Sequence, residues 1–201
     1  MKKLFSLLYL LSITLGLSAQ NNSKGIEILD KAERSIQNSE GIRVKFESNN
    51  HGTFLMKGEK FYLNCAGIQT WYNGNTQWSY VEENDEVTIT TPSLDELQSV
   101  NPYLLIKSYK KGYICKSCKK STLNGYHGYE IVLIPNKYQD IASITLFISD
   151  NYRPLNIKFT QNNQSSIEFK VTSWEESKNL SVDLFIFNTN KFPNTEIIDL
   201  R

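Results

Sequence analysis

Residues 71–80 read Trp71-Tyr-Asn-Gly-Asn-Thr-Gln-Trp-Ser-Tyr80, which is the pattern of a β-hairpin. Two arms rich in aromatic residues flank Asn-Gly, a dipeptide that favours the tight turns of hairpins. An acidic turn and Val87-Thr-Ile89 follow, and then the very apolar segment Asn101-Pro-Tyr-Leu-Leu-Ile106. A sheet with large apolar residues on one face, next to an apolar flap, predicts a hydrophobic cavity with a lid rather than a catalytic centre.

Working outward, short segments on both sides of this hairpin alternate apolar and polar residues, as half-buried strands do. The predicted strands cover residues 42–47, 52–57, 60–65, 68–72, 77–81, 86–90, 113–120, 126–134, 143–149, 155–160, 167–174 and 184–187. So many antiparallel strands must protect their edges, which predicts curling toward a barrel with an internal cavity.

Two segments have a helical pattern instead. Apolar residues spaced by three and four predict an amphipathic helix over residues 23–40, with Ser23 as its N-cap and Gly41 as its stop. Residues 93–109 interrupt the strands, and Ser93 and Glu96 have the spacing of a capping box. The fold class is therefore α+β and mainly β, with about 11 strands, an N-terminal helix and a short helical lid.

The chain begins with a basic Met-Lys-Lys, an apolar run from Leu4 to Leu17 and the small residues Ser18 and Ala19. This is the pattern of a secretory signal peptide, which we expect to cover residues 1–20. Residues 21–201 are long enough for one domain. Removal of Lys2 and Lys3 leaves 20 basic against 21 acidic residues, so no overall positive charge favours nucleic acid.

In order and spacing, the chain resembles the LolA-like periplasmic outer-membrane lipoprotein carriers. The resemblance begins with the amphipathic helix and a strand ending in Phe46. It continues through Gly52-x-Phe54-x-x-Lys57, Phe61, Asn73-Gly74-x-x-x-Trp78-x-Tyr80, Val87, Pro102-Tyr-Leu-Leu-Ile106, Leu184-Phe-Ile-Phe187, Phe192-Pro193 and Ile198-Asp-Leu-Arg201.

The resemblance implies a half-open antiparallel barrel closed by helices, in a soluble monomer of the periplasm. Such a carrier takes lipoproteins from an inner-membrane exporter, shelters their acyl chains and passes them to an outer-membrane acceptor, without a cofactor. The family pattern has an arginine that holds the lid, but Gly58 stands at that position. Either Lys57 replaces this arginine as the donor that controls the lid, or the lid is held more loosely.

If side chains alternate along the predicted strands, one concave face carries most of the residues that we expect to bind lipid. Three more come from the lid. These are Val44, Phe46, Phe54, Met56, Phe61, Leu63, Trp71, Trp78, Tyr80, Val87, Ile89, Leu104, Leu105 and Ile106. Methionine and aromatic side chains adapt well to a flexible chain. The alternative is that these side chains simply pack one another in a filled core.

Cys115-x-x-Cys118 resembles a redox motif, but it lies in a strand-like segment without the following helix that lowers a thiolate pKa. In an oxidising compartment we expect a structural disulfide instead, either between Cys115 and Cys118 or from one of them to Cys65.

No other pattern indicates an enzyme. The two histidines lack partners at metal-ligand spacing, so we expect no metal, and no nucleophile elbow or phosphate loop is present. The lysines of residues 107–120 and the acids of residues 82–86 are either solvated edges or patches that dock the carrier on its partners. A lipid-sensing envelope adaptor of the same fold is the alternative function, and a thiol–disulfide protein is a third.

Overall fold

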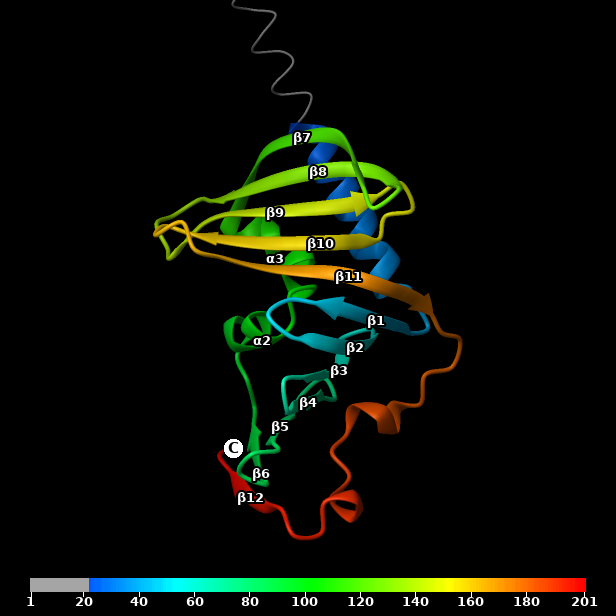
Figure 1. The fold of residues 1–201 in the computed structure, drawn as a ribbon, viewed down its shortest axis with the longest axis vertical. Helices are drawn as coiled ribbons and strands as arrows, with labels where there is room; N and C mark the ends of the chain where they lie inside the picture. The colour runs from blue at the N-terminus through cyan, green and yellow to red at the C-terminus, as the bar shows by residue number, and fades with distance from the viewer. Residues whose placement is uncertain (1–21) are drawn as a thin grey trace, which may run out of the picture. The chain divides into compact units, whose positions relative to one another are not determined.

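The computed structural model describes residues 22–201, and Figure 1 shows its fold. The predicted signal peptide, residues 1–20, lies outside the described residues. None of the described helices is both long and apolar enough to cross a membrane.

Strands dominate the chain and a few helices interrupt them. The first helix covers residues 22–37. The strands are β1 (Ile42–Glu47), β2 (His51–Lys57), β3 (Lys60–Cys65), β4 (Ile68–Tyr72), β5 (Gln77–Val81), β6 (Glu86–Thr90), β7 (Tyr113–Leu123), β8 (Tyr126–Pro135), β9 (Ile141–Ser149), β10 (Pro154–Gln161), β11 (Ser166–Glu176) and β12 (Glu196–Asp199). The helices between them are α2 (Leu94–Val100), α3 (Leu104–Gly112) and the short 3-10 helices η1 (Val182–Phe185) and η2 (Thr189–Lys191).

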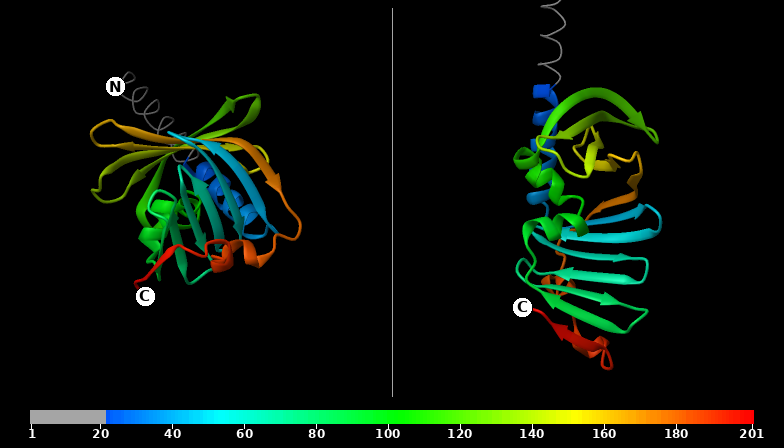
Figure 2. Two further views of the ribbon diagram at one scale, coloured as in Figure 1. Left: turned by 60° about the horizontal axis from the view of Figure 1, so that its bottom comes forward. Right: turned by 90° about the vertical axis from the view of Figure 1, so that its left-hand side faces the viewer.

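The chain divides into two compact units. Unit 1 contains the described residues up to Ala32 together with Ile106–Ser166, and unit 2 contains Glu33–Leu105 and Ile167–Arg201. In unit 1 the strands follow the order β10-β9-β8-β7, all antiparallel. In unit 2 the order is β12-β6-β5-β4-β3-β2-β1-β11, and only β12 runs parallel to its neighbour (Figures 1 and 2). The prediction of a single LolA-like domain over residues 21–201 stays a prediction.

The predicted α+β, mainly-β class with an N-terminal helix and short further helices is confirmed. The capping box predicted at α2 is also present, because Ser93 Oγ accepts the Glu96 backbone N–H while the Glu96 carboxylate accepts the Ser93 N–H. This reciprocal pair satisfies two backbone donors at the start of a helix of only seven residues.

The strand predicted at residues 184–187 is wrong. The apolar residues there alternate as in a strand, but Ser181 Oγ accepts the Asp183 N–H and starts the 3-10 helix η1 instead. Phe185 and Phe187 are buried while Leu184 and Ile186 remain exposed, which is the pattern that resembled a strand. The last strand is β12, and it brings the number of described strands to twelve.

Candidate functional site

The two faces of the unit 2 sheet are defined by the pairing of its strands. Residues directly opposite on neighbouring antiparallel strands point to the same face. One face therefore contains the cross-strand row Val44, Phe54, Leu63, Thr70, Ser79 and Thr88, and we call it the Phe54 face. The other contains the row Arg43, Leu55, Tyr62, Trp71, Trp78 and Ile89, and we call it the Trp71 face.

The prediction that all the lipid-binding strand residues share one face is wrong. Val44, Phe46, Phe54, Met56, Phe61 and Leu63 lie on the Phe54 face, whereas Trp71, Trp78, Tyr80, Val87 and Ile89 lie on the Trp71 face. The cause is the two-residue turn Ala66-Gly67, which pairs Cys65 with Ile68 and so places Trp71 opposite Tyr62. Because β4 has large apolar residues at both 71 and 72, alternation alone did not show which one follows Phe61 and Leu63.

The Phe54 face is covered by the lid segment within unit 2. The rings of Phe54 and Phe61 stack at 5.4 Å, and the Phe54 ring lies 5.8 Å from that of Tyr103. Leu97, Tyr103 and Leu105 are buried, and Phe54 is only 1% exposed. The predicted lid therefore packs on predicted lipid-binding residues. Of the other two lid residues, Leu104 is half-buried, and Ile106, which belongs to unit 1, is buried.

Two polar groups are located among these apolar side chains. Trp174 on β11 is opposite Val44, and its indole Nε1 is buried with no hydrogen-bond partner among the described residues. The Tyr103 ring lies 5.9 Å from the Trp174 ring, and burial raises the pKa of the Tyr103 hydroxyl well above its usual range. A buried N–H without an acceptor is costly, so a ligand carbonyl on this face would gain from bonding to it. Sequence patterning did not identify Trp174, because the pairing of β11 with β1, which lie far apart in the chain, was not foreseen.

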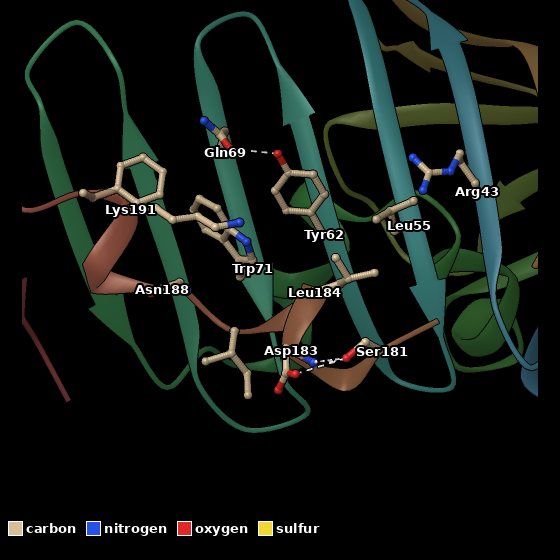
Figure 3. A pocket seen from close by; sticks show the side chains of 12 residues that line it. Arg43, Leu55, Tyr62, Gln69, Trp71, Ser181, Asp183, Leu184, Asn188 and Lys191 are labelled. Carbon is tan, nitrogen blue, oxygen red and sulfur yellow. Dashed lines mark hydrogen bonds between the residues drawn. The ribbon is translucent and has the colours of Figure 1, made fainter. Parts of the chain in front are cut away.

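The Trp71 face carries a groove of about 540 Å³, which Figure 3 shows from close by. Side chains of β1–β4 form its floor, and the C-terminal segment, residues 177–195, forms its other wall. The lining residues are Arg43, Leu55, Tyr62, Gln69, Trp71, Ser181, Asp183, Leu184, Ile186, Asn188, Lys191 and Phe192. Of the predicted lipid-binding residues only Trp71 lines this groove. The lining residues of β1–β3 were missed because the Phe54 face was taken as the ligand-binding face, and those near η1 because this segment looked like a strand.

Contacts at both ends hold the C-terminal segment against the sheet. At one end Lys57 Nζ donates to the Leu180 carbonyl at 2.7 Å. At the other end Phe187 and Phe192 pack around Trp71 and Tyr80, with ring separations from 4.7 to 5.9 Å. These anchors leave the middle of the segment to span the groove.

Lys57 therefore bonds to the C-terminal segment, whereas the sequence suggested that it controls the lid at residues 93–109. Gly58, which stands where the family pattern has an arginine, lies in the β2–β3 turn with φ +60°. Only glycine adopts that region freely, which explains its presence there.

The three cysteines are free thiols in the structure, so it does not contain the predicted disulfide between Cys115 and Cys118. A bulge at Lys116 turns both side chains to the same buried face of β7, beneath Gly25 of the first helix. Burial raises the pKa of Cys118 to about 11 and also raises that of Cys115, the reverse of what a redox-active thiolate requires.

Several charged side chains of the lysine-rich residues 107–120 and of the acidic turn 82–86 make contacts within the protein. Lys110 pairs with Asp30 at 2.7 Å and Lys119 with Glu130 at 2.8 Å. In the acidic turn, Asp85 Oδ1 accepts hydrogen bonds from Tyr80 and from Thr195. Within residues 22–201, no three His, Cys, Asp or Glu side chains gather as a metal site requires.

Comparison with solved structures finds the same fold in distant relatives. An uncharacterised conserved protein from Thermus thermophilus superimposes with a TM-score of 0.62 at 14% identity, covering 86% of this chain and 97% of that one. The lipoprotein LppX of Mycobacterium tuberculosis superimposes with a TM-score of 0.52 at 9% identity, covering 80% of this chain and all of the other. These likenesses concern the fold alone.

Comparison with curated protein sequences finds no match. The family model described as outer membrane lipoprotein carrier protein LolA, in contrast, matches residues 15–164, well over half of the sequence. The chain therefore belongs to the LolA family of outer membrane lipoprotein carrier proteins.

Proposed function

We propose that this protein is a periplasmic carrier that shelters the acyl chains of lipoproteins on the Phe54 face and delivers them toward the outer membrane. Residues 1–20 would direct its export. Its partners would be an inner-membrane exporter that loads it and an outer-membrane acceptor that unloads it. The binding is noncovalent and involves neither catalysis nor a cofactor.

One observation supports the proposal: in a member of a lipoprotein-carrier family, a short helical segment packs against the sheet face that contains the buried side chains of Phe54, Met56 and Phe61. Phe54 contacts Tyr103 of this segment and stacks on Phe61, and Met56 beside them is buried. A helix of seven residues is held mainly by its tertiary contacts, so it can be displaced more readily than a paired strand. An acyl chain would replace contacts that the lid makes in the empty protein.

The energy required of such a carrier is substantial. Each methylene exposed to water costs about 0.8 kcal/mol, so a chain of a dozen or more resists leaving a membrane by about 10 kcal/mol. Apolar rings and a methionine supply surface that offsets this cost without demanding hydrogen bonds. The buried Nε1 of Trp174 would bond to an ester or amide carbonyl of the lipid.

Site-specific photo-crosslinking tests where the lipid binds. A photoreactive phenylalanine derivative replaces Tyr103 and, in a matched control, Tyr138, which is 92% exposed. With a triacylated lipopeptide we expect strong crosslinking from position 103 and little from 138, because only position 103 packs against the Phe54 face. Equal labelling from both positions, or labelling from neither, contradicts the proposed site.

Depletion of the protein in its host tests the transport role. Lipoproteins stranded in the inner membrane on depletion support a carrier. Unchanged lipoprotein sorting, together with intact lipopeptide binding, would instead indicate a sensing adaptor.

A further inference from the structure

We propose that the groove on the Trp71 face is a second binding site, for an amphiphile with one acyl chain and an anionic head group that Arg43 binds. This site goes beyond the proposed carrier function. It lies on the opposite face of the sheet and uses no residue of the Phe54 face.

The middle of the groove suits an unbranched hydrocarbon chain. Its volume of about 540 Å³ falls within the range of roughly 300–1,000 Å³ that is usual for small-molecule sites. Leu55 and Trp71 lie on the floor, and Leu184 lies on the C-terminal wall (Figure 3). Ile186, of the same segment, also lines the groove. Leu184 and Ile186 are each 41% exposed, although Phe185 between them is fully buried. Large apolar side chains left this open along a groove are the surface that a ligand chain would cover.

Arg43 supplies a positive charge at the β1 end of the groove. Its side chain is half-buried, and Figure 3 shows the guanidinium directed toward Leu55. Within residues 22–201 it has no hydrogen-bond or ion-pair partner, even though Glu175 is directly opposite it on β11. The Glu175 carboxylate accepts from the Ser173 hydroxyl instead.

An unpaired, partly desolvated guanidinium is best satisfied by an anion with two oxygens in its plane. The other charged residues that line the groove do not neutralise Arg43. The one carboxylate in the groove lining, that of Asp183, accepts from Ser181 Oγ at 3.2 Å, and Lys191 adds a second cation farther along (Figure 3).

Together these features select one chemical class. An uncharged lipid would leave Arg43 unpaired, and a small polar anion would leave the apolar length of the groove uncovered. An acyl chain that ends in a carboxylate or a phosphate satisfies both. The floor is rigid β-sheet, so chain length and head-group charge should both affect affinity.

Isothermal titration calorimetry on the purified secreted protein tests the site with three ligands that share one chain. These are palmitate, palmitoyl lysophosphatidate and uncharged monopalmitin. We expect Arg43→Gln to weaken binding of the anionic ligand at least about tenfold, because it removes a charge-assisted hydrogen bond, and to leave monopalmitin unchanged. Lys45→Gln is the matched control, since Lys45 is an exposed cation two residues further along the same strand and face. It should bind all three ligands as the parent protein does.

A second variant tests the apolar wall. Leu184→Trp should fill the groove and abolish the preference for the anionic ligands over monopalmitin, and an unchanged melting temperature shows that the fold is kept. If that variant is unstable, Ile186→Trp makes the same test. Binding of only palmitate or only lysophosphatidate supports the site and identifies its head group. Equal affinity of Arg43→Gln and Lys45→Gln for both anionic ligands, or an unchanged preference for those ligands in the filled-groove variant, overturns the proposal. Crosslinking of the lipopeptide at position 103 is read separately, so the two proposals fail independently.

Discussion

Gly25 shows how one residue sets the packing of the first helix on β7. A Cβ atom added there would lie 2.5 Å from Cys115 Sγ and 3.1 Å from the Cβ of Cys118. Glycine usually weakens a helix, so its presence among Ile28, Leu29 and other core residues follows from this close approach rather than from helix propensity. The two cysteines are accordingly packing residues of unit 1.

We expect Gly25→Ala to destabilise the protein by about 1–3 kcal/mol, because the new methyl group overpacks the contact with Cys115. Urea denaturation measures the change. Gly112→Ala is the control: Gly112 ends α3 with nothing within 4 Å of its added Cβ, so that substitution should be neutral or slightly stabilising. Equal stability of the two variants would contradict the packing role of Gly25.

At the scale of elements, the C-terminal segment turns an exposed sheet face into a groove. Its apolar residues could have added a strand, but η1 and η2 shorten it, and its two ends are fastened to β2 and to the β5–β6 turn. Lys57 on β2 holds Leu180, and Asp85 in the β5–β6 turn holds Thr195 through a 2.6 Å hydrogen bond. The groove therefore depends on how this segment is anchored.

We expect Lys57→Met to loosen the start of this segment, because it removes the charged donor to the Leu180 carbonyl. The loss should be about 1–2 kcal/mol, less than for a fully buried charged bond. Hydrogen exchange should become faster in residues 177–187 while β8 and β9 stay protected. Lys60→Met, at the cross-strand partner of Lys57, is the control and should change neither. Faster exchange in both variants would show that the effect is not specific to the Leu180 bond.

At the scale of the whole molecule, burial of titratable groups makes stability depend on pH. Burial raises the pKa of Cys118 from 9.0 to about 11, and it also raises the pKa values of Cys115 and Tyr103. The folded state then holds a proton that the unfolded state has already released. Because the unfolded state binds fewer protons in this window, the free energy of unfolding must fall as pH rises.

We therefore expect the free energy of unfolding to decrease between pH 9 and pH 11. The decrease should be shallower in Cys118→Ala, which lacks one of the groups. Urea titrations at several pH values measure both slopes. A slope in Cys118→Ala as steep as in the parent protein would mean that the Cys118 thiol is not protected in the folded state.

The fold class could be predicted because it depends on local patterns of the linear sequence, and the family was suggested by a resemblance in the order of the motifs. Strand alternation, the Asn73-Gly74 turn and the Ser93–Glu96 capping box are local features, and all three appear in the structure. The site was harder to predict. Apolar residues at both 71 and 72 allow either face of β4 to join Phe54, and the alternation at 184–187 fits both a strand and η1.

The sequence by itself determined that this chain is mainly β with a capped helical segment after its hairpins, because those properties rest on local propensity and periodicity. Its family followed from the order of its motifs, which resembles that of the lipoprotein carriers. Tertiary structure alone decided which aromatic residues share a face, since strand register depends on the length of each turn and on the contacts across it. It also decided that residues 177–195 form one wall of a groove beside Arg43. That arrangement arises from contacts between residues more than a hundred positions apart in the chain, such as Lys57 and Leu180, and short-range patterns do not contain them.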